Sequence, residues 1–184
     1  MTMKDKKSPG WTAFSHLALS VADLARSRAF YCGALGFSAG EEYLSSGPRA
    51  AKLLECPASG FAGCFLRRGD ALLELLCYAE GAPGEVTPRR PQEHGLAHVS
   101  FTVDDIGAVV AEIERYGGAL RTRLDHSFGG KPEQPRTAIV FCTDPDGNRI
   151  ELIAHPASAE RAAHTAFLGL QEIGWPAANR RSLS

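Results

Sequence analysis

The sequence predicts an α+β protein built from two modules, each with the order strand, helix and three strands, forming a curved mixed sheet. Two observations support this fold class. The stretch HLALSVADLA from residue 16 and the stretch HVSFTVDDIG from residue 98 match at the histidine, at the valine five residues later and at the aspartate two beyond it. Each stretch also opens a segment in which strand-like and helix-like apolar patterns follow in the same order, which indicates an internal duplication.

The expected domain boundaries follow changes in composition. Residues 1–11 are polar and are expected to form a disordered tail, residues 12–80 the first module and residues 96–155 the second. The Pro- and Gly-rich stretch 81–95 is typical of a linker. Residues 156–184 are interpreted as a C-terminal helix and tail.

The first module begins with FSHLALSV, residues 14–21, whose apolar character predicts a strand. A helix is predicted next, because Asp23 can accept hydrogen bonds from its first turn and Gly36 can end it. Three strands are then expected, with the sequences RAAKLLEC (49–56), GCFLRRG (63–69) and ALLELLCY (71–78).

The second module repeats this order, beginning with a strand at LAHVSFTV, residues 96–103. Apolar residues at helical spacing predict a helix in the following segment, which ends at Gly117 and Gly118. A loop is expected from Asp125 to Arg136, followed by the strands TAIVFCTD and NRIELIAH. The turn between these strands is DPDG, in which Gly147 can adopt a positive φ.

Composition excludes several functional classes. The 20 basic and 21 acidic residues give a net charge of −1, which argues against a nucleic-acid partner. The 5 cysteines are odd in number and include no C-x-x-C pair, which favours reduced thiols in a cytoplasmic protein. The chain also lacks a stretch of about 18 apolar residues and a signal-like N-terminus, so no membrane association is expected.

One histidine and one glutamate recur at matching places in the two modules. Because strand side chains alternate, His16 and His98 fall on the smaller, more polar face of their strands. Glu74 and Glu151 lie in the apolar strands LLELLCY and RIELIAH, where a carboxylate needs a partner to offset its desolvation. Two imidazoles and two carboxylates suit a mononuclear site for one divalent metal ion with positions left open for substrate.

The order His16, Glu74, His98, Glu151 within two such modules resembles the vicinal oxygen chelate superfamily, the glyoxalase, bleomycin resistance and dioxygenase fold. The resemblance is closest to glyoxalase I and methylmalonyl-CoA epimerase, and it is carried by HLALSVADLARSRAFYCGALGF, ALLELLCY, GLAHVSFTVDD and DPDGNRIELI. It implies a glyoxalase-like cup, a homodimer, a small-molecule substrate and one divalent ion, which is Zn, Ni, Co, Mn, Fe or Mg.

The resemblance further implies a lyase or isomerase of the lactoylglutathione lyase type, in which the metal polarises a carbonyl and a carboxylate moves the neighbouring proton. It assigns the base to Glu151, with Glu74 as a second base or fixed ligand. Ser20 and Tyr78 stand where the bacterial glutathione-dependent enzymes carry Arg and Asn, which argues against glutathione.

Four alternatives remain open, and one of them is an antibiotic-modifying transferase of the fosfomycin type, which uses three metal ligands. An acyl-CoA epimerase would use similar proton chemistry, although its members usually carry Gln at the position of Glu74. An extradiol-type ring-cleaving dioxygenase needs two histidines and a single glutamate, so Glu74 argues against it. A drug-binding resistance protein would be no enzyme and would have no use for paired strand carboxylates.

The segment 44–66 is rich in small and apolar residues. We interpret it first as ordinary core and loop. The alternative is that it walls an apolar pocket together with Phe128.

Overall fold

The computed structural model describes residues 13–55, 60–80, 90, 92–125 and 138–154. The chain divides into two compact units, residues 1–86 and 87–184. Each unit contains one sheet of four strands, and a helix packs against each sheet. This arrangement of helices and mixed sheets confirms the α+β fold class.

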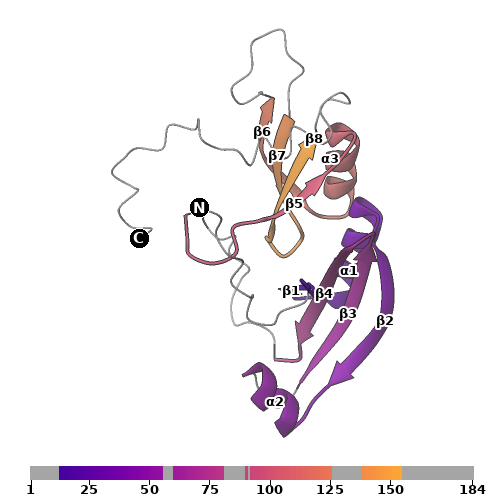
Figure 1. Ribbon diagram of the computed structural model, residues 1–184, viewed down its shortest axis with the longest axis vertical. Coiled ribbons are helices and arrows are strands. Elements are labelled where there is room, and N and C mark those ends of the chain that lie inside the picture. The colour runs from indigo at the N-terminus through magenta and orange to yellow at the C-terminus, as the bar shows by residue number, and fades with distance from the viewer. Residues whose placement is uncertain (1–12, 56–59, 81–89, 91, 126–137, 155–184) are drawn as a thin grey trace, which may run out of the picture. The chain divides into compact units, whose positions relative to one another are not determined.

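The sheet of the first unit has the strand order β1-β4-β3-β2 (Figure 1). β1 runs parallel to β4, whereas β4, β3 and β2 are antiparallel neighbours. The elements in chain order are β1 (Leu17–Ser20), α1 (Leu24–Leu35), β2 (Ser38–Ser45), α2 (Pro48–Leu54), β3 (Phe61–Arg68) and β4 (Ala71–Tyr78).

The helix α1 begins and ends where the sequence predicts. The Asp23 side chain accepts a hydrogen bond from the Arg26 backbone N–H at 2.9 Å, and Gly36 ends the helix with a φ of 67°. Phe30 and Leu35 on the helix are buried. The buried residues of the sheet are Leu19, Cys64, Leu66, Leu73 and Leu75. Their alternation along the strands shows that the apolar face of the sheet lies against α1.

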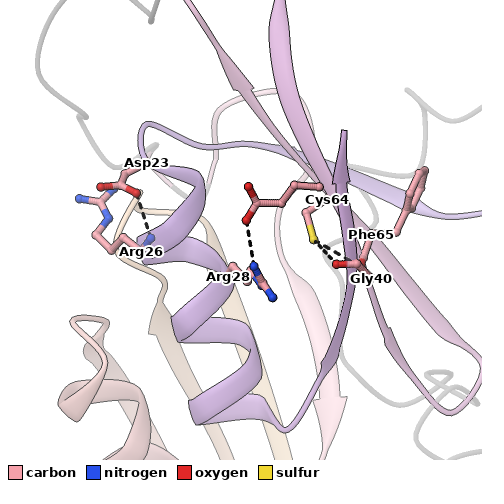
Figure 2. A network of polar contacts seen from close by, with 7 residues as sticks. Asp23, Arg26, Arg28, Gly40, Cys64 and Phe65 are labelled. Carbon is pink, nitrogen blue, oxygen red and sulfur yellow. Dashed lines mark hydrogen bonds and ion pairs between the residues drawn. The ribbon is translucent and has the colours of Figure 1, made fainter. Parts of the chain in front are cut away.

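A bulge in β2 changes which face of the sheet its side chains occupy. The register with β3 shifts between Ala39 and Glu42, so one extra residue is inserted into β2. Figure 2 shows the contacts around it: Arg28 on α1 forms an ion pair with Glu42 at 2.9 Å, and the Cys64 thiol lies 3.5 Å from the Gly40 carbonyl oxygen. Beyond the bulge, Tyr43 lies opposite Gly63.

The second unit repeats the arrangement with the strand order β5-β8-β7-β6. Its elements are β5 (Val99–Thr102), α3 (Ile106–Arg115), β6 (Ala119–Asp125), β7 (Ala138–Thr143) and β8 (Arg149–Ala154). β5 is parallel to β8, and β6 carries a register shift between Leu120 and Thr122. Asp105 accepts a hydrogen bond from the Ala108 backbone N–H at 3.0 Å at the start of α3.

The turn that leads into β8 is organised by Asp144, which is buried. Its carboxylate accepts hydrogen bonds from the backbone N–H groups of Asp146 and Asn148 at 2.9 and 2.8 Å, and from the Asn148 side-chain amide at 2.8 Å. Gly147 has a φ of 82°, as the DPDG motif predicts. This turn fixes the start of the strand that carries Glu151.

Two sequence predictions about elements are wrong. The stretch RAAKLLEC was expected to be a strand, but Pro48–Leu54 is the helix α2 and the strand is Ser38–Ser45. Pro48 occupies the first helical turn, where it is tolerated, and Ala, Lys and Leu favour a helix. After the helix of the second module only the strands TAIVFCTD and NRIELIAH were located, and Asp125 was expected to begin a loop, whereas β6 (Ala119–Asp125) is the third strand that the module order requires.

Several predictions fall outside the described residues. These are the tail 1–11, the C-terminal helix within 156–184, Phe128 and most of the linker 81–95, so the expected domain boundaries stay predictions. Within the described part of the chain, no helix is long and apolar enough to cross a membrane.

Candidate metal centre

His16 and Glu74 lie together on the face of the first sheet that points away from α1, which we call the open face. Glu74 is paired across the strands with Ala18 on β1 and with Phe65 on β3, and side chains at directly paired positions share a face. His16 stands two residues before Ala18, at the start of β1, and therefore faces the same way.

The two side chains are in direct contact. His16 Nε2 lies 3.1 Å from Glu74 Oε2, and the side chains are 33% and 15% exposed, respectively. The edge of the His16 ring also packs on Phe65, with a distance of 5.5 Å between ring centroids and an angle of 88°. The contact is thus partly shielded from water on one side and reachable on the other.

The second unit contains the same arrangement. Glu151 is paired with Ser100 on β5 and with Phe141 on β7, and His98 stands two residues before Ser100. His98 Nε2 lies 3.4 Å from Glu151 Oε2, with the side chains 37% and 13% exposed. The His98 ring packs on Phe141 at 5.5 Å. The duplication therefore reproduces the contact itself, down to the supporting phenylalanine.

These distances fit donor atoms that share one ion. Two donor atoms that are each about 2.1 Å from an ion lie about 3.0 Å apart at a right angle and about 3.4 Å apart at a tetrahedral angle. The distances of 3.1 and 3.4 Å in the two units span this interval. The donor types, imidazole nitrogen and carboxylate oxygen, also suit a divalent transition metal or zinc. An ordinary His–Glu ion pair would give similar distances.

Ser15 lies beside the other nitrogen of the His16 ring, with Ser15 Oγ 2.9 Å from His16 Nδ1. Where Nδ1–H donates to Ser15, Nε2 presents its lone pair to the Glu74 side, which is the form of the ring that binds a metal ion. In the second unit Ala97 precedes His98, so this support is particular to the first unit.

Each unit supplies two candidate ligands. Within the described residues of either unit, no group of three or more His, Cys, Asp or Glu side chains is arranged to hold a metal ion. The structure brings His16 to Glu74 and His98 to Glu151, and metal binding by these residues stays a prediction. The meeting of all four side chains at one ion stays a prediction.

Sequence reasoning missed one residue at this site, Tyr43. Its hydroxyl donates a hydrogen bond to Glu74 Oε1, the oxygen that does not contact His16. Burial, followed by the hydrogen bond to Glu74, raises the pKa of Tyr43 well above its ordinary value, so the phenol stays protonated and acts as a donor. Tyr43 faces Glu74 because the bulge shifts the register of β2 against β3. An alternating pattern read from the sequence cannot show such a shift.

Two cavities flank the His16–Glu74 contact on the open face. One, of about 440 Å³, adjoins Glu74 and is lined mainly by apolar side chains, among them Leu44, Leu53, Leu54, Phe61 and Leu76. The other, of about 590 Å³, adjoins His16 and includes Ser38 and Arg67. Phe65 lines both. The segment 44–66 therefore does contribute to an apolar cavity beside a candidate ligand.

Comparison with known proteins identifies relatives along most of the described chain. The sequence model of the Glyoxalase/Bleomycin resistance protein/Dioxygenase superfamily matches residues 13–152. The chain is 33% identical over 138 residues to the protein YaeR of Escherichia coli, covering 74% of this chain and 92% of that protein. It is 30% identical over 148 residues to a lactoylglutathione lyase of Haemophilus influenzae, covering 78% and 93%.

Among solved structures, a glyoxalase family protein from Bacillus cereus superposes with a TM-score of 0.69 at 14% identity, covering 82% of this chain and 98% of that one. At this identity the likeness shows the glyoxalase-like fold alone. Because the sequence model of the family matches residues 13–152, across both modules, the chain belongs to the Glyoxalase/Bleomycin resistance protein/Dioxygenase superfamily.

Proposed function

We propose that the protein is a metal-dependent lyase or isomerase of the glyoxalase I-like type, which transfers a proton next to a carbonyl of a small-molecule substrate. The ligands of its single divalent ion would be His16, Glu74, His98 and Glu151. One observation carries the proposal: two separate units each hold a histidine Nε2 against a glutamate Oε2 at matching strand positions.

The residue types account for the chemistry. When bound, the ion supplies Lewis-acid polarisation of a substrate oxygen. Each histidine contributes a neutral donor, and each glutamate a negative charge that offsets the charge of the ion and is relieved of its own desolvation cost. Glu151 is the carboxylate that we assign to removing and returning the proton at the neighbouring carbon, since a carboxylate can act as a general base over a short distance.

The cavity beside Glu74 supports a compact substrate with an apolar substituent. The cavity beside Glu74 is lined by leucine and phenylalanine side chains, and none of its described lining residues is basic. Apolar walls favour an alkyl or aryl group over the charged arms of glutathione. The 30% identity to a lactoylglutathione lyase supports the type of reaction more strongly than it supports glutathione as the thiol of the substrate.

A direct experiment measures exchange of the substrate proton with solvent deuterium. We expect the metal-loaded protein to incorporate deuterium next to the carbonyl of a 2-oxoaldehyde hemithioacetal made with a small thiol, and Glu151→Gln to lose the exchange. Glu112→Gln is the matched control, because Glu112 is paired with Arg115 on the surface of α3. Equal exchange by Glu151→Gln and the wild-type protein would contradict the assignment.

The same preparation distinguishes the other members of the superfamily. Exchange at the carbon next to an acyl-CoA thioester, without a hemithioacetal reaction, would indicate an epimerase. Oxygen uptake with a catechol would indicate a ring-cleaving dioxygenase. Tight binding of an apolar drug without metal or turnover would indicate a resistance protein.

We further propose a homodimer, in which the ligands meet either within one chain or between two chains. Mixing of inactive His16→Ala and His98→Ala proteins separates the two arrangements. If the ligands meet between chains, the mixture regains sites with all four wild-type ligands. If they meet within one chain, the mixture stays inactive.

A further inference from the structure

The two glutamates of the proposed centre have different surroundings. Tyr43 donates a hydrogen bond to Glu74, and Glu74 also contacts His16 through its other oxygen. Both carboxylate oxygens of Glu74 are therefore engaged. In the described part of the second unit, Glu151 contacts His98 and has no hydrogen-bond donor comparable to Tyr43.

The Tyr43 ring is held in place on three sides. It stacks on Phe65 with 5.8 Å between ring centroids and an angle of 24°, and it meets the Phe61 ring edge-on at 6.1 Å. Beneath it lies Gly63, where an added Cβ would fall 2.8 Å from Tyr43 Cε1 and closer still to the phenol end of the ring. The absence of a side chain at Gly63 is what lets the ring lie over the sheet toward Glu74.

The fold directs this side chain to the open face. Without the extra residue of the β2 bulge, the register at Ser38 and Ala39 would continue, and Glu42 instead of Tyr43 would lie opposite Gly63. The bulge is anchored by the Arg28–Glu42 ion pair (Figure 2). A specific irregularity of the strand thus brings a phenol to one of the two carboxylates.

The duplication provides an internal comparison. β6 has a shift at the corresponding place, and its register sets Leu124 opposite Ile139 where the first unit has Tyr43 opposite Gly63. A leucine has no hydrogen-bond donor in its side chain, and an isoleucine occupies the position of the glycine. At this register position, among the described residues, the first unit has a phenol and the second does not.

We propose that Tyr43 is a positioning residue that fixes Glu74 as an immobile ligand and makes the two carboxylates of the centre unequal. This inference rests on the proposed function, since it assumes that Glu74 is a ligand. A hydrogen bond to a ligating carboxylate orients it and holds one rotamer. Glu151 has no such donor among the residues that the structure describes, and so it keeps the freedom that a proton-transferring carboxylate needs.

The test is the affinity for Co²⁺, followed by titration calorimetry and by the visible absorption bands of the bound ion, which report its coordination. We expect Tyr43→Phe to lower the Co²⁺ affinity by about 10- to 100-fold and to alter the bands, as loss of a hydrogen bond to a ligand does. Tyr78→Phe is the matched control, because Tyr78 packs on the same Phe61 ring.

A double-mutant cycle shows whether Tyr43 acts through Glu74. The effect of Tyr43→Phe on Co²⁺ affinity should vanish when Glu74 is already Ala, which removes the acceptor of the hydrogen bond, and should persist in full when Glu151 is Ala. An unchanged affinity and spectrum in Tyr43→Phe, or an effect that depends on Glu151 instead, would overturn the inference while leaving the proposed function standing. A wild-type protein that binds no Co²⁺ would overturn both.

Discussion

Replacement of Gly63 by alanine tests the packing that places Tyr43. Gly63 does not have a positive φ, so alanine fits its backbone and the effect of the substitution is steric. The new Cβ would displace the ring from Phe65 and its hydroxyl from Glu74. An aromatic pair contributes about 0.5–1.5 kcal/mol and a hydrogen bond to a charged group about 1.5–3 kcal/mol. Alanine regains about 0.5–1 kcal/mol through its lower unfolded-chain entropy.

The expected net loss is about 1–4 kcal/mol in the free energy of unfolding, which overlaps the loss of about 1–3 kcal/mol that is typical of overpacking. The assay is urea unfolding followed by far-UV circular dichroism for Gly63→Ala, Tyr43→Ala and the double variant. In the Tyr43→Ala background the glycine substitution should become neutral or slightly stabilising, because the ring that it strikes is gone. If Gly63→Ala lowered the free energy of unfolding equally in the wild-type protein and in Tyr43→Ala, the claim that the new Cβ strikes the Tyr43 ring would be refuted.

Three further predictions concern the rest of the fold. Asp144→Ala should lower the free energy of unfolding by about 1–3 kcal/mol, because two backbone N–H groups lose their acceptor; a neutral result in urea unfolding would contradict the role of the turn. Leu75→Ala should cost about 2–5 kcal/mol, since the side chain is fully buried, and a loss below about 1 kcal/mol would mean that the site is not packed as described. Burial raises the pKa of Cys142 from 9.0 to about 11. The unfolded thiol therefore ionises first, and stability should fall by up to about 3 kcal/mol as pH rises through that window. Cys142→Ala should show a shallower fall with pH, and an identical pH profile would exclude the thiol as its cause.

The sequence predicts the repeated elements well because their signals are local. Asp23 and Gly36 bound α1, and the DPDG motif forms the expected turn at Gly147. Alternation along the strand also predicts which face of its strand each histidine occupies. The contact of each histidine with its glutamate depends on the register between parallel strands, which the sequence does not give.

The parts that the sequence does not predict depend on tertiary structure. α2 replaces an expected strand because Pro48 and its Ala- and Leu-rich continuation favour a helix, while the exposed β2 shows little apolar alternation. Tyr43 reaches Glu74 only because a bulge shifts the register and Gly63 leaves room. A periodic pattern in the sequence shows neither the bulge nor the space that Gly63 leaves.

The central claim is that the two units together hold a single divalent ion. The most direct test is the number of Co²⁺ ions bound per chain in the wild-type protein and in His16→Ala and His98→Ala. We expect one tightly bound ion per chain in the wild-type protein and loss of tight binding in each variant. Two ions per chain, or one variant that keeps a tightly bound ion, would show that the His–Glu pairs act separately and would contradict the claim.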